Sequence, residues 1–140
     1  MRVMALDVGD KTIGVAISDA LLLTAQPRPT IRRKNLQADL QILRNLAQDN
    51  EVDQIVVGQP LHMDGTESRQ RQKVARFVEE LHKVLNLPTI FWDERLTSFE
   101  AEQHLEQMGL NWRARRSQVD KIAAMIILQS YLDTRSGRPA

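Results

Sequence analysis

Several residue types that mark common protein classes are absent or scarce in this chain of 140 residues. There is no cysteine, so disulfide bonds and cysteine-based metal sites are excluded, as is usual in a reducing cytoplasm. Aromatic residues make up 4% of the chain, too few for the stacking platforms that bind single-stranded nucleic acid. No apolar run is long enough to span a membrane, and no signal-peptide pattern is present. We therefore expect a cytoplasmic protein without a membrane partner.

An excess of charge of one sign is also missing. The 19 Lys and Arg residues nearly balance the 18 Asp and Glu residues, which leaves a formal net charge of +1. Any binding of nucleic acid must therefore come from local clusters of basic residues and not from a field of the whole molecule. A chain of this length can bury roughly two-thirds of its unfolded surface unaided. We expect a single domain over residues 1–140.

The stretch from Val3 to Asp19 has the composition of two strands joined by a tight turn. Apolar runs at 3–6 and 13–17 flank a polar segment that contains Gly9. The first run is apolar on both faces, which is typical of a central strand. Asp7 follows it, at the strand end where α/β sheets place ligands. The alternative is that Asp7 only accepts hydrogen bonds from turn amides.

The rest of the chain predicts an α/β fold. In order, we expect an edge strand within 21–33, a helix over 37–48, strands over 53–58 and 88–92 separated by a helix over 68–85, and further helices over 97–108 and 118–134. Because a helix separates them, the strands near Val3, Asp53 and Thr89 should be parallel neighbours. Their carboxyl ends should then meet at one edge of the sheet.

Two groups of basic residues stand out. One lies on a single stripe of the helix predicted over 68–85, and a solvated helix face is its simplest explanation. The other lies in a segment, 111–116, that we predict to be a linker before the last helix. The first group is Arg69, Lys73 and Arg76, and the second is Arg113, Arg115 and Arg116.

Carboxylates from separate segments should gather at the shared strand edge. Asp7 ends one strand, Asp93 and Glu94 end another, and Asp120 lies near the predicted start of the last helix. At about 4 Å and an effective dielectric constant near 20, each pair would repel by on the order of 4 kcal/mol. Mg²⁺ or Mn²⁺ would offset that repulsion, since both prefer hard oxygen ligands.

Each carboxylate also has a purely structural explanation. Asp93 and Glu94 could form a solvated strand end that pairs with Arg95. Ser117 and Asp120 have the spacing of a helix-capping pair. Spacing alone therefore indicates only a possible metal site.

Four segments carry a resemblance to a known family and run in the same order as the motifs of that family. The segments are DVGDKTIGVAISD at 7–19, VVGQPLHMDGTES at 56–68, DERLTSFEAE at 93–102 and VDKIAAMIILQSYL at 119–132. They resemble motifs of the YqgF/RuvX family, described both as Holliday junction resolvases and as nucleases of precursor ribosomal RNA. The resemblance covers nearly the whole chain. It implies a ribonuclease H-like fold, with a mixed five-stranded sheet flanked by helices.

The resemblance also implies site residues. The catalytic, metal-binding carboxylates would be Asp7, Glu94 and Asp120, with Asp93 as a candidate fourth ligand and Mg²⁺ or Mn²⁺ as the cofactor. Asp64 would shape a loop. Contacts to nucleic acid would come from Lys11, Arg95, Arg113, Arg115 and Arg116. The chain departs from the family in one respect: a Lys is common shortly before the last Asp, and here the basic residues upstream are Arg115 and Arg116.

The expected activity is hydrolysis of phosphodiester bonds in structured nucleic acid by a two-metal-ion mechanism. The favoured substrate is the 5′ end of precursor 16S ribosomal RNA, with ribosomal particles as further partners. Holliday junction resolution and a non-catalytic role in ribosome assembly are the alternatives. An actin-like ATPase is a poorer match, because no second phosphate loop is found and the chain is short for two domains. The sequence is compatible with a monomer or a homodimer.

Overall fold

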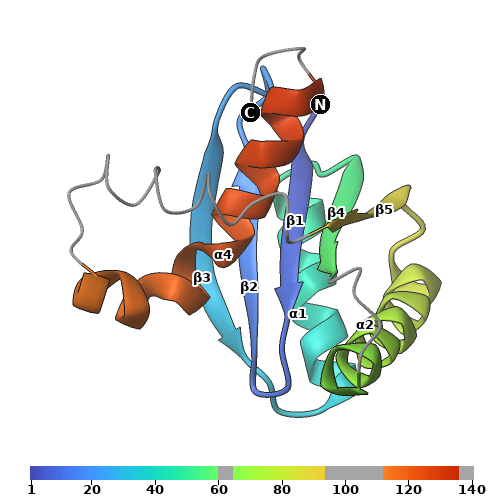
Figure 1. The fold of residues 1–140 in the computed structure, drawn as a ribbon. Coiled ribbons are helices and arrows are strands. Elements are labelled where there is room, and N and C mark those ends of the chain that lie inside the picture. The colour runs from blue at the N-terminus through green and yellow to red at the C-terminus, as the bar shows by residue number, and fades with distance from the viewer. Residues whose placement is uncertain (60–64, 94–111, 136–140) are drawn as a thin grey trace.

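A five-stranded mixed sheet forms the centre of the protein (Figure 1). The computed structural model describes residues 1–59, 65–93 and 112–135, with the side chains of 65–68 and 112–122 excepted. The strands are β1 (Val3–Val8), β2 (Thr12–Ser18), β3 (Ala25–Arg32), β4 (Gln54–Gln59) and β5 (Thr89–Asp93), and the helices are α1 (Leu36–Asp49), α2 (Gly65–Val84) and α4 (Trp112–Arg135). None of these helices is both long and apolar enough to cross a membrane.

The order of the strands across the sheet is β3-β2-β1-β4-β5. β1, β2 and β3 are antiparallel neighbours, whereas β1, β4 and β5 run parallel. The predicted mixed sheet and the predicted parallel set are both confirmed. The carboxyl ends of β1, β4 and β5 therefore lie at one edge. β3 takes the outer position that Pro27 and Pro29 require, because proline cannot donate to a ladder of backbone hydrogen bonds.

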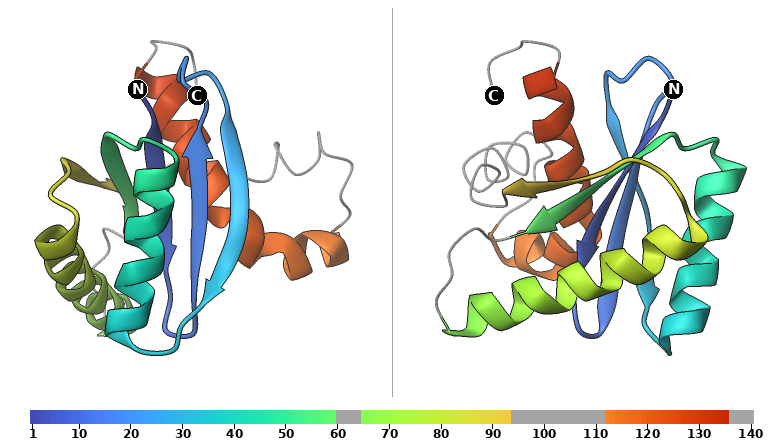
Figure 2. Two further views of the ribbon diagram at one scale, coloured as in Figure 1. Left: turned by 180° about the vertical axis from the view of Figure 1, so that it is seen from behind. Right: turned by 90° about the vertical axis from the view of Figure 1, so that its right-hand side faces the viewer.

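The pleat of β1 divides the core into two halves. Met4 and Leu6 pack with apolar residues of α1 and α2, while Val3 and Ala5 pack with those of α4. Figure 2 shows the same layers, with α1 and α2 on one face of the sheet and α4 on the other. Side chains alternate along a strand, so Asp7 shares the α4 face with Val3 and Ala5.

The last helix is longer than the sequence pattern predicts. It begins at Trp112, so the predicted linker over 111–116 is wrong and its arginines, Arg113, Arg115 and Arg116, lie in the first turns of α4. Ser117 is inside the helix, so its reading as the cap in a pair with Asp120 is also wrong. The apolar pattern marks only the buried second half. The first half is polar but consists largely of good helix formers and contains no Gly or Pro.

The other helix boundaries agree more closely with the pattern. α1 covers the predicted 37–48, and α2 begins three residues before the predicted Ser68. The helix predicted over 97–108 and its terminating Gly109 lie outside the described residues, as does the predicted loop around Asp64.

Side-chain hydrogen bonds fix α4 on the sheet. Gln129 accepts a hydrogen bond from the amide of Ala25 (3.0 Å) and donates one to the carbonyl of Leu23 (3.1 Å). The indole of Trp92 donates to the hydroxyl of Ser130 (3.4 Å). Gln129 and Ser130 belong to the fourth family-like segment, and their contacts explain these two polar positions as anchors for the helix.

Asp19 organises the connection between β2 and β3. Its carboxylate accepts hydrogen bonds from the amides of Leu21, Leu23 and Thr24. These bonds, with that from Thr24 contributing most, hold the pKa of Asp19 below its ordinary value of 3.8. The final Asp of the first family-like segment therefore has a structural task.

The lowered pKa makes the stabilisation by Asp19 dependent on pH. The charged form is favoured in the folded state, so the contribution is complete above pH 3.8 and is lost as the pH falls below it, through the folded-state pKa. We expect Asp19→Asn to lower the free energy of unfolding at pH 7. The decrease should be smaller below pH 3.8, where Asp19 of the wild type becomes protonated. Urea titrations across this range measure the difference. Asp49→Asn, at the exposed end of α1, is the matched control, and an Asp19→Asn effect that stays constant with pH would contradict the assignment.

Candidate active site

Asp7 lies on the α4 face of the sheet, near the end of its central strand. It lies next to the last residue of β1 and is half-buried. Its partner on β2 is Gly14, and the residue beside it on β4 is Gly58, which follows the partner of Leu6. By strand alternation both glycines are on the same face as Asp7. The two strand positions that flank Asp7 on this face therefore carry no side chain.

The helix that carries Asp120 crosses this same face. α4 contacts β1, β2 and β3, and Asp120 is the ninth residue of the 24-residue helix. In Figure 1 the first half of α4 lies toward the end of the sheet at which β1 ends. The fold thus brings Asp7 and the backbone around Asp120 to one face. The side chain of Asp120 and the whole of Glu94 lie outside the described part.

Asp93 has a different placement. Ile90 and Trp92 of β5 pack toward α4, whereas Phe91 borders residues of α2. Alternation puts Asp93 on the Phe91 face, opposite to Asp7, and it pairs with Gln59 of β4. The geometry therefore favours a ligand set without Asp93.

The donors present fit a hard divalent cation. Asp7 offers carboxylate oxygens, which Mg²⁺ and Mn²⁺ prefer. Among the side chains that the structure describes, no three His, Cys, Asp or Glu residues are grouped so that they could hold a metal ion. Glu94 and Asp120 are not in that set, so the predicted trio stays a prediction.

The turn that follows Asp7 is held tightly from both sides. The amide of Gly9 donates to the carbonyl of Thr12 (2.9 Å), and a Cβ at Gly9 would lie 3.1 Å from that oxygen. The side-chain amide of Gln70 on α2 donates to the carbonyl of Val8 (3.0 Å). The guanidinium of Arg33 donates to the carbonyl of Gly9 (2.9 Å).

Arg33 is itself fixed by a buried partner. Its Nε donates to Asp39 at 3.1 Å, and its guanidinium lies 5.0 Å from the ring centre of Phe77. The Asp39 side chain is 1% exposed and also accepts from the amide of Lys34. Sequence reasoning missed this clamp. A signal was available, because Asp39 falls beside Leu40 and Leu43 on the apolar stripe of α1, and a buried carboxylate requires a buried partner.

The residues predicted to contact nucleic acid lie in separate parts of the chain. Lys11 lies exposed in the β1–β2 turn, and its carbonyl accepts from the amide of Arg33 (2.9 Å). Arg113, Arg115 and Arg116 are on the first turns of α4, with side chains that are not described. Arg95 lies outside the described residues.

The arrangement of strands and helices defines the class. It is that of a ribonuclease H-like protein, with a carboxylate near the end of the central strand. The fold matches Thermus thermophilus RuvC "in complex with Holliday junction substrate", with a TM-score of 0.67 and 12% identity over 98% of this chain and 96% of that one. It also matches the fowlpox virus Holliday junction resolvase, with a TM-score of 0.58 and 17% identity over 96% and 99% of the two chains. At these identities the likeness shows the fold.

The chain belongs to the RuvX family, described as Holliday junction resolvase, which matches residues 1–134. A relative from Syntrophus aciditrophicus is 48% identical over 136 residues, which cover 97% of this chain and 91% of the relative. A second, from Caldanaerobacter subterraneus, is also 48% identical over 136 residues, covering 96% and 98%. Both carry the name "Putative pre-16S rRNA nuclease". The family resemblance of the four segments is confirmed.

The clamp generates a prediction about stability. Asp39→Ala leaves Arg33 without its ion partner, and breaking a buried pair costs ~3–5 kcal/mol. We expect a loss at the low end of that range, since the Arg33 side chain is 24% exposed. Urea unfolding monitored by circular dichroism measures it. Glu80→Ala breaks the exposed pair with Lys83 and should cost less than ~1 kcal/mol, and equal losses in the two variants would refute a special role for the clamp.

Proposed function

We propose that this protein is a metal-dependent nuclease that hydrolyses phosphodiester bonds in structured nucleic acid. The observation that carries the proposal is the position of Asp7, near the carboxyl end of the central strand and on the face crossed by the helix of Asp120. A charge held at a rigid, half-buried strand end is suited to bind a cation in a defined place. Membership of the RuvX family supports the same chemistry.

Three carboxylates would hold the divalent ions. We assign this role to Asp7, Glu94 and Asp120, and we leave out Asp93 because of its face. Bound Mg²⁺ or Mn²⁺ supplies stabilisation of negative charge on the phosphate oxygens, and a pair of ions would do so at both the entering and the leaving oxygen. The chain itself would orient the carboxylates, place glycines rather than larger residues at the two strand positions that flank Asp7, and offer cations to neighbouring phosphates.

Those cations would come from three segments of the chain. Lys11 projects from the turn that follows Asp7, and Arg113, Arg115 and Arg116 lie on the same helix as Asp120. Arg95 follows the proposed ligand Glu94 in sequence. Contacts of this kind position the backbone of the substrate and do not read its bases.

The substrate that we favour is the precursor of 16S ribosomal RNA, processed in the cytoplasm at its 5′ end on ribosomal particles. The names of the relatives support this choice. A four-way DNA junction is the second candidate, supported by the description of the family and by the titles of the resolvases that share the fold.

The catalytic assignment predicts that Asp7→Asn abolishes cleavage while the fold is retained. The substitution keeps the shape of the side chain but removes the charge that would bind the ion. Mutation of a residue that only hydrogen-bonds to a metal ligand already lowers metal affinity or activity ~10–100-fold. Asp7 would bind the metal directly, so we expect a larger loss of activity. Precursor RNA and junction DNA, labelled and incubated side by side with Mg²⁺, provide the assay. Asp49→Asn should cleave normally, whereas wild-type rates from folded Asp7→Asn would remove Asp7 from the mechanism.

The ligand set also predicts which metals work. An all-oxygen set should accept Mg²⁺ or Mn²⁺ and should not need Zn²⁺. Ca²⁺ is larger and takes more ligands, so it should support binding but align water and phosphate poorly, and a misplacement of about 1 Å can cost ~100-fold in rate. Gel shift and product formation in each metal test this expectation. Full cleavage in excess chelator would be incompatible with a metal-dependent nuclease.

A further inference from the structure

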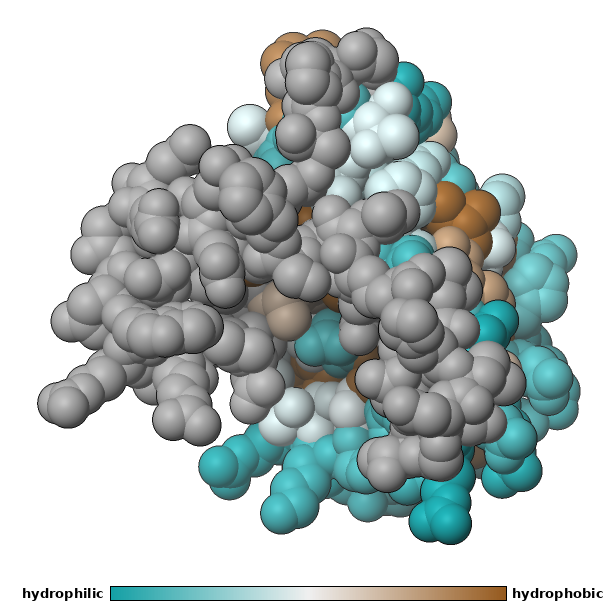
Figure 3. All heavy atoms as spheres, viewed as in Figure 1, coloured by the Kyte–Doolittle hydropathy of each residue, from teal (hydrophilic) through white to brown (hydrophobic). Residues whose placement is uncertain are grey.

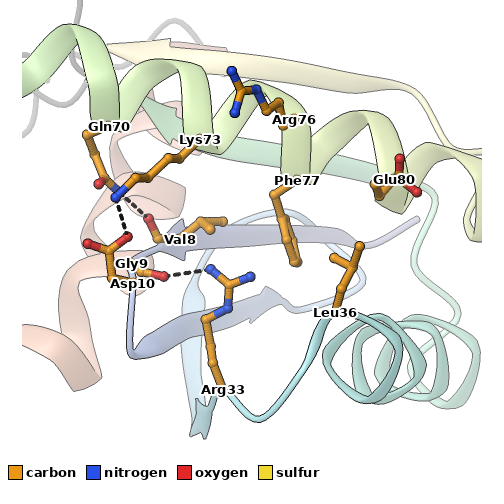
Figure 4. Close-up of a pocket in the computed structure, with 10 residues that line it drawn as sticks. All are labelled: Val8, Gly9, Asp10, Arg33, Leu36, Gln70, Lys73, Arg76, Phe77 and Glu80. Carbon is orange, nitrogen blue, oxygen red and sulfur yellow. Dashed lines mark hydrogen bonds and ion pairs between the residues drawn. The ribbon is translucent and has the colours of Figure 1, made fainter.

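An open groove lies on the other side of the β1–β2 turn, on the sheet face opposite to Asp7. It has a volume of about 330 Å³ and runs between the turn and α2 (Figure 4). One wall is formed by Gly9 and Asp10, and the other by Gln70, Lys73 and Arg76 of α2. Arg33 and Phe77 lie at its base. The proposed function does not use this groove.

The cations of the groove differ in how firmly they are engaged. Arg33 is committed to buried Asp39. Lys73 contacts Asp10 at 3.2 Å, but both side chains are largely exposed, at 58% and 64%. Such exposed pairs contribute ~0–1 kcal/mol, so a stronger anion can displace Asp10. Arg76 is exposed and has no recorded partner in the part of the chain that the structure describes.

A second acidic residue of the groove lies on α2 and is also in an exposed ion pair. Glu80 also borders the groove, but it pairs with Lys83 at 3.0 Å. Lys73 and Arg76 therefore face an entering anion with Asp10 and Glu80 as the acidic groups of the lining, and Arg69 continues the cationic stripe along α2 outside the lining. Arg69 and Arg76 are seven residues apart, or about 10 Å along a helix. That length matches about three steps of a nucleic-acid strand at ~3.4 Å each.

The groove is also close to the candidate active site along the chain. Gly9 is two residues after Asp7, or about 7 Å along an extended strand. Figure 3 shows hydrophilic side chains along the lower margin of the molecule, where the β1–β2 turn and the start of α2 lie in Figure 1. A strand bound near Asp7 would pass the turn and Lys11 to reach the groove.

We propose that this groove binds the phosphodiester backbone of the nucleic-acid segment that flanks the cleavage site, through Lys73 and Arg76. The proposal rests on the proposed nuclease function and extends its substrate contact to the α2 face. The side-chain amide of Gln70 is used by the carbonyl of Val8, and the two cations are exposed groups on flexible stems. The groove therefore contributes affinity and orientation and does not read sequence.

The test is equilibrium binding of a labelled RNA hairpin and a labelled four-way DNA junction, in Ca²⁺, over ~50 to ~200 mM salt. The double variant Lys73→Gln/Arg76→Gln should bind more weakly, and its slope of log affinity against log salt should fall by ~1.4–1.8, or ~0.7–0.9 for each lost phosphate contact. The matched control is Arg44→Gln/Arg135→Gln, which removes the same charge from exposed positions on α1 and α4. It should keep the wild-type slope.

A second variant should change the affinity in the opposite direction. Asp10→Asn releases Lys73 and should tighten binding, whereas Asp49→Asn makes the same charge change at the far end of α1 and should not. An unchanged salt slope in Lys73→Gln/Arg76→Gln would refute binding of nucleic acid in the groove. An equal fall of the slope in Arg44→Gln/Arg135→Gln would refute it as well. If the wild-type protein binds neither the RNA hairpin nor the DNA junction, the proposed nuclease function itself fails. If the wild type binds and the groove variant binds equally well, only the groove proposal fails.

Discussion

The pleat of the central strand β1 is the constraint on which the rest of the structure depends. Its residues are buried on both faces, so successive side chains must satisfy two separate cores, one with α1 and α2 and one with α4. A shift of one residue in register would exchange these faces and destroy both cores. The same alternation directs Asp7 toward α4, while the backbone of the next two residues borders the groove beside α2. One strand thus determines the placement of the candidate site and of the groove.

The turn after β1 lies between the candidate site on the α4 face and the groove beside α2, and it is held in place by side chains. Arg33 and Gln70 hold its carbonyls, and Asp39 holds Arg33 in place from within the core. The turn is therefore anchored to both α1 and α2, and Asp7 sits directly before it. Positioning a carboxylate closely requires such support, because a ligand that moves by about 1 Å can lose most of its effect on rate. The family-like segments contain structural residues as well as candidate site residues. Ser18, Asp19 and Gln129 are structural, because their side chains hold loops and helices in place.

The groove and the candidate site together suggest how a nuclease with almost no net charge can hold its substrate. Its basic residues are distributed in small clusters at the turn, along α2 and on the first turns of α4. Local cation clusters act over about a Debye length, so their arrangement matters more than the total charge.

The sequence by itself determined the α/β class, the parallel set of strands, the edge position of β3 and the family, because periodicity, proline and motif order are local signals. It also placed Asp7 at a strand end. Only the tertiary structure decided that Asp93 faces away from Asp7, that Arg33 pairs with Asp39, and that α4 starts at Trp112. The face of Asp93 depends on the register of β5 against β4. Arg33 and Asp39 are close in sequence, but Gly9 and Phe77 come next to Arg33 only when the β1–β2 turn and α2 are in place. The sequence of the polar first half of α4 has no apolar stripe, so periodicity could not mark where that helix begins.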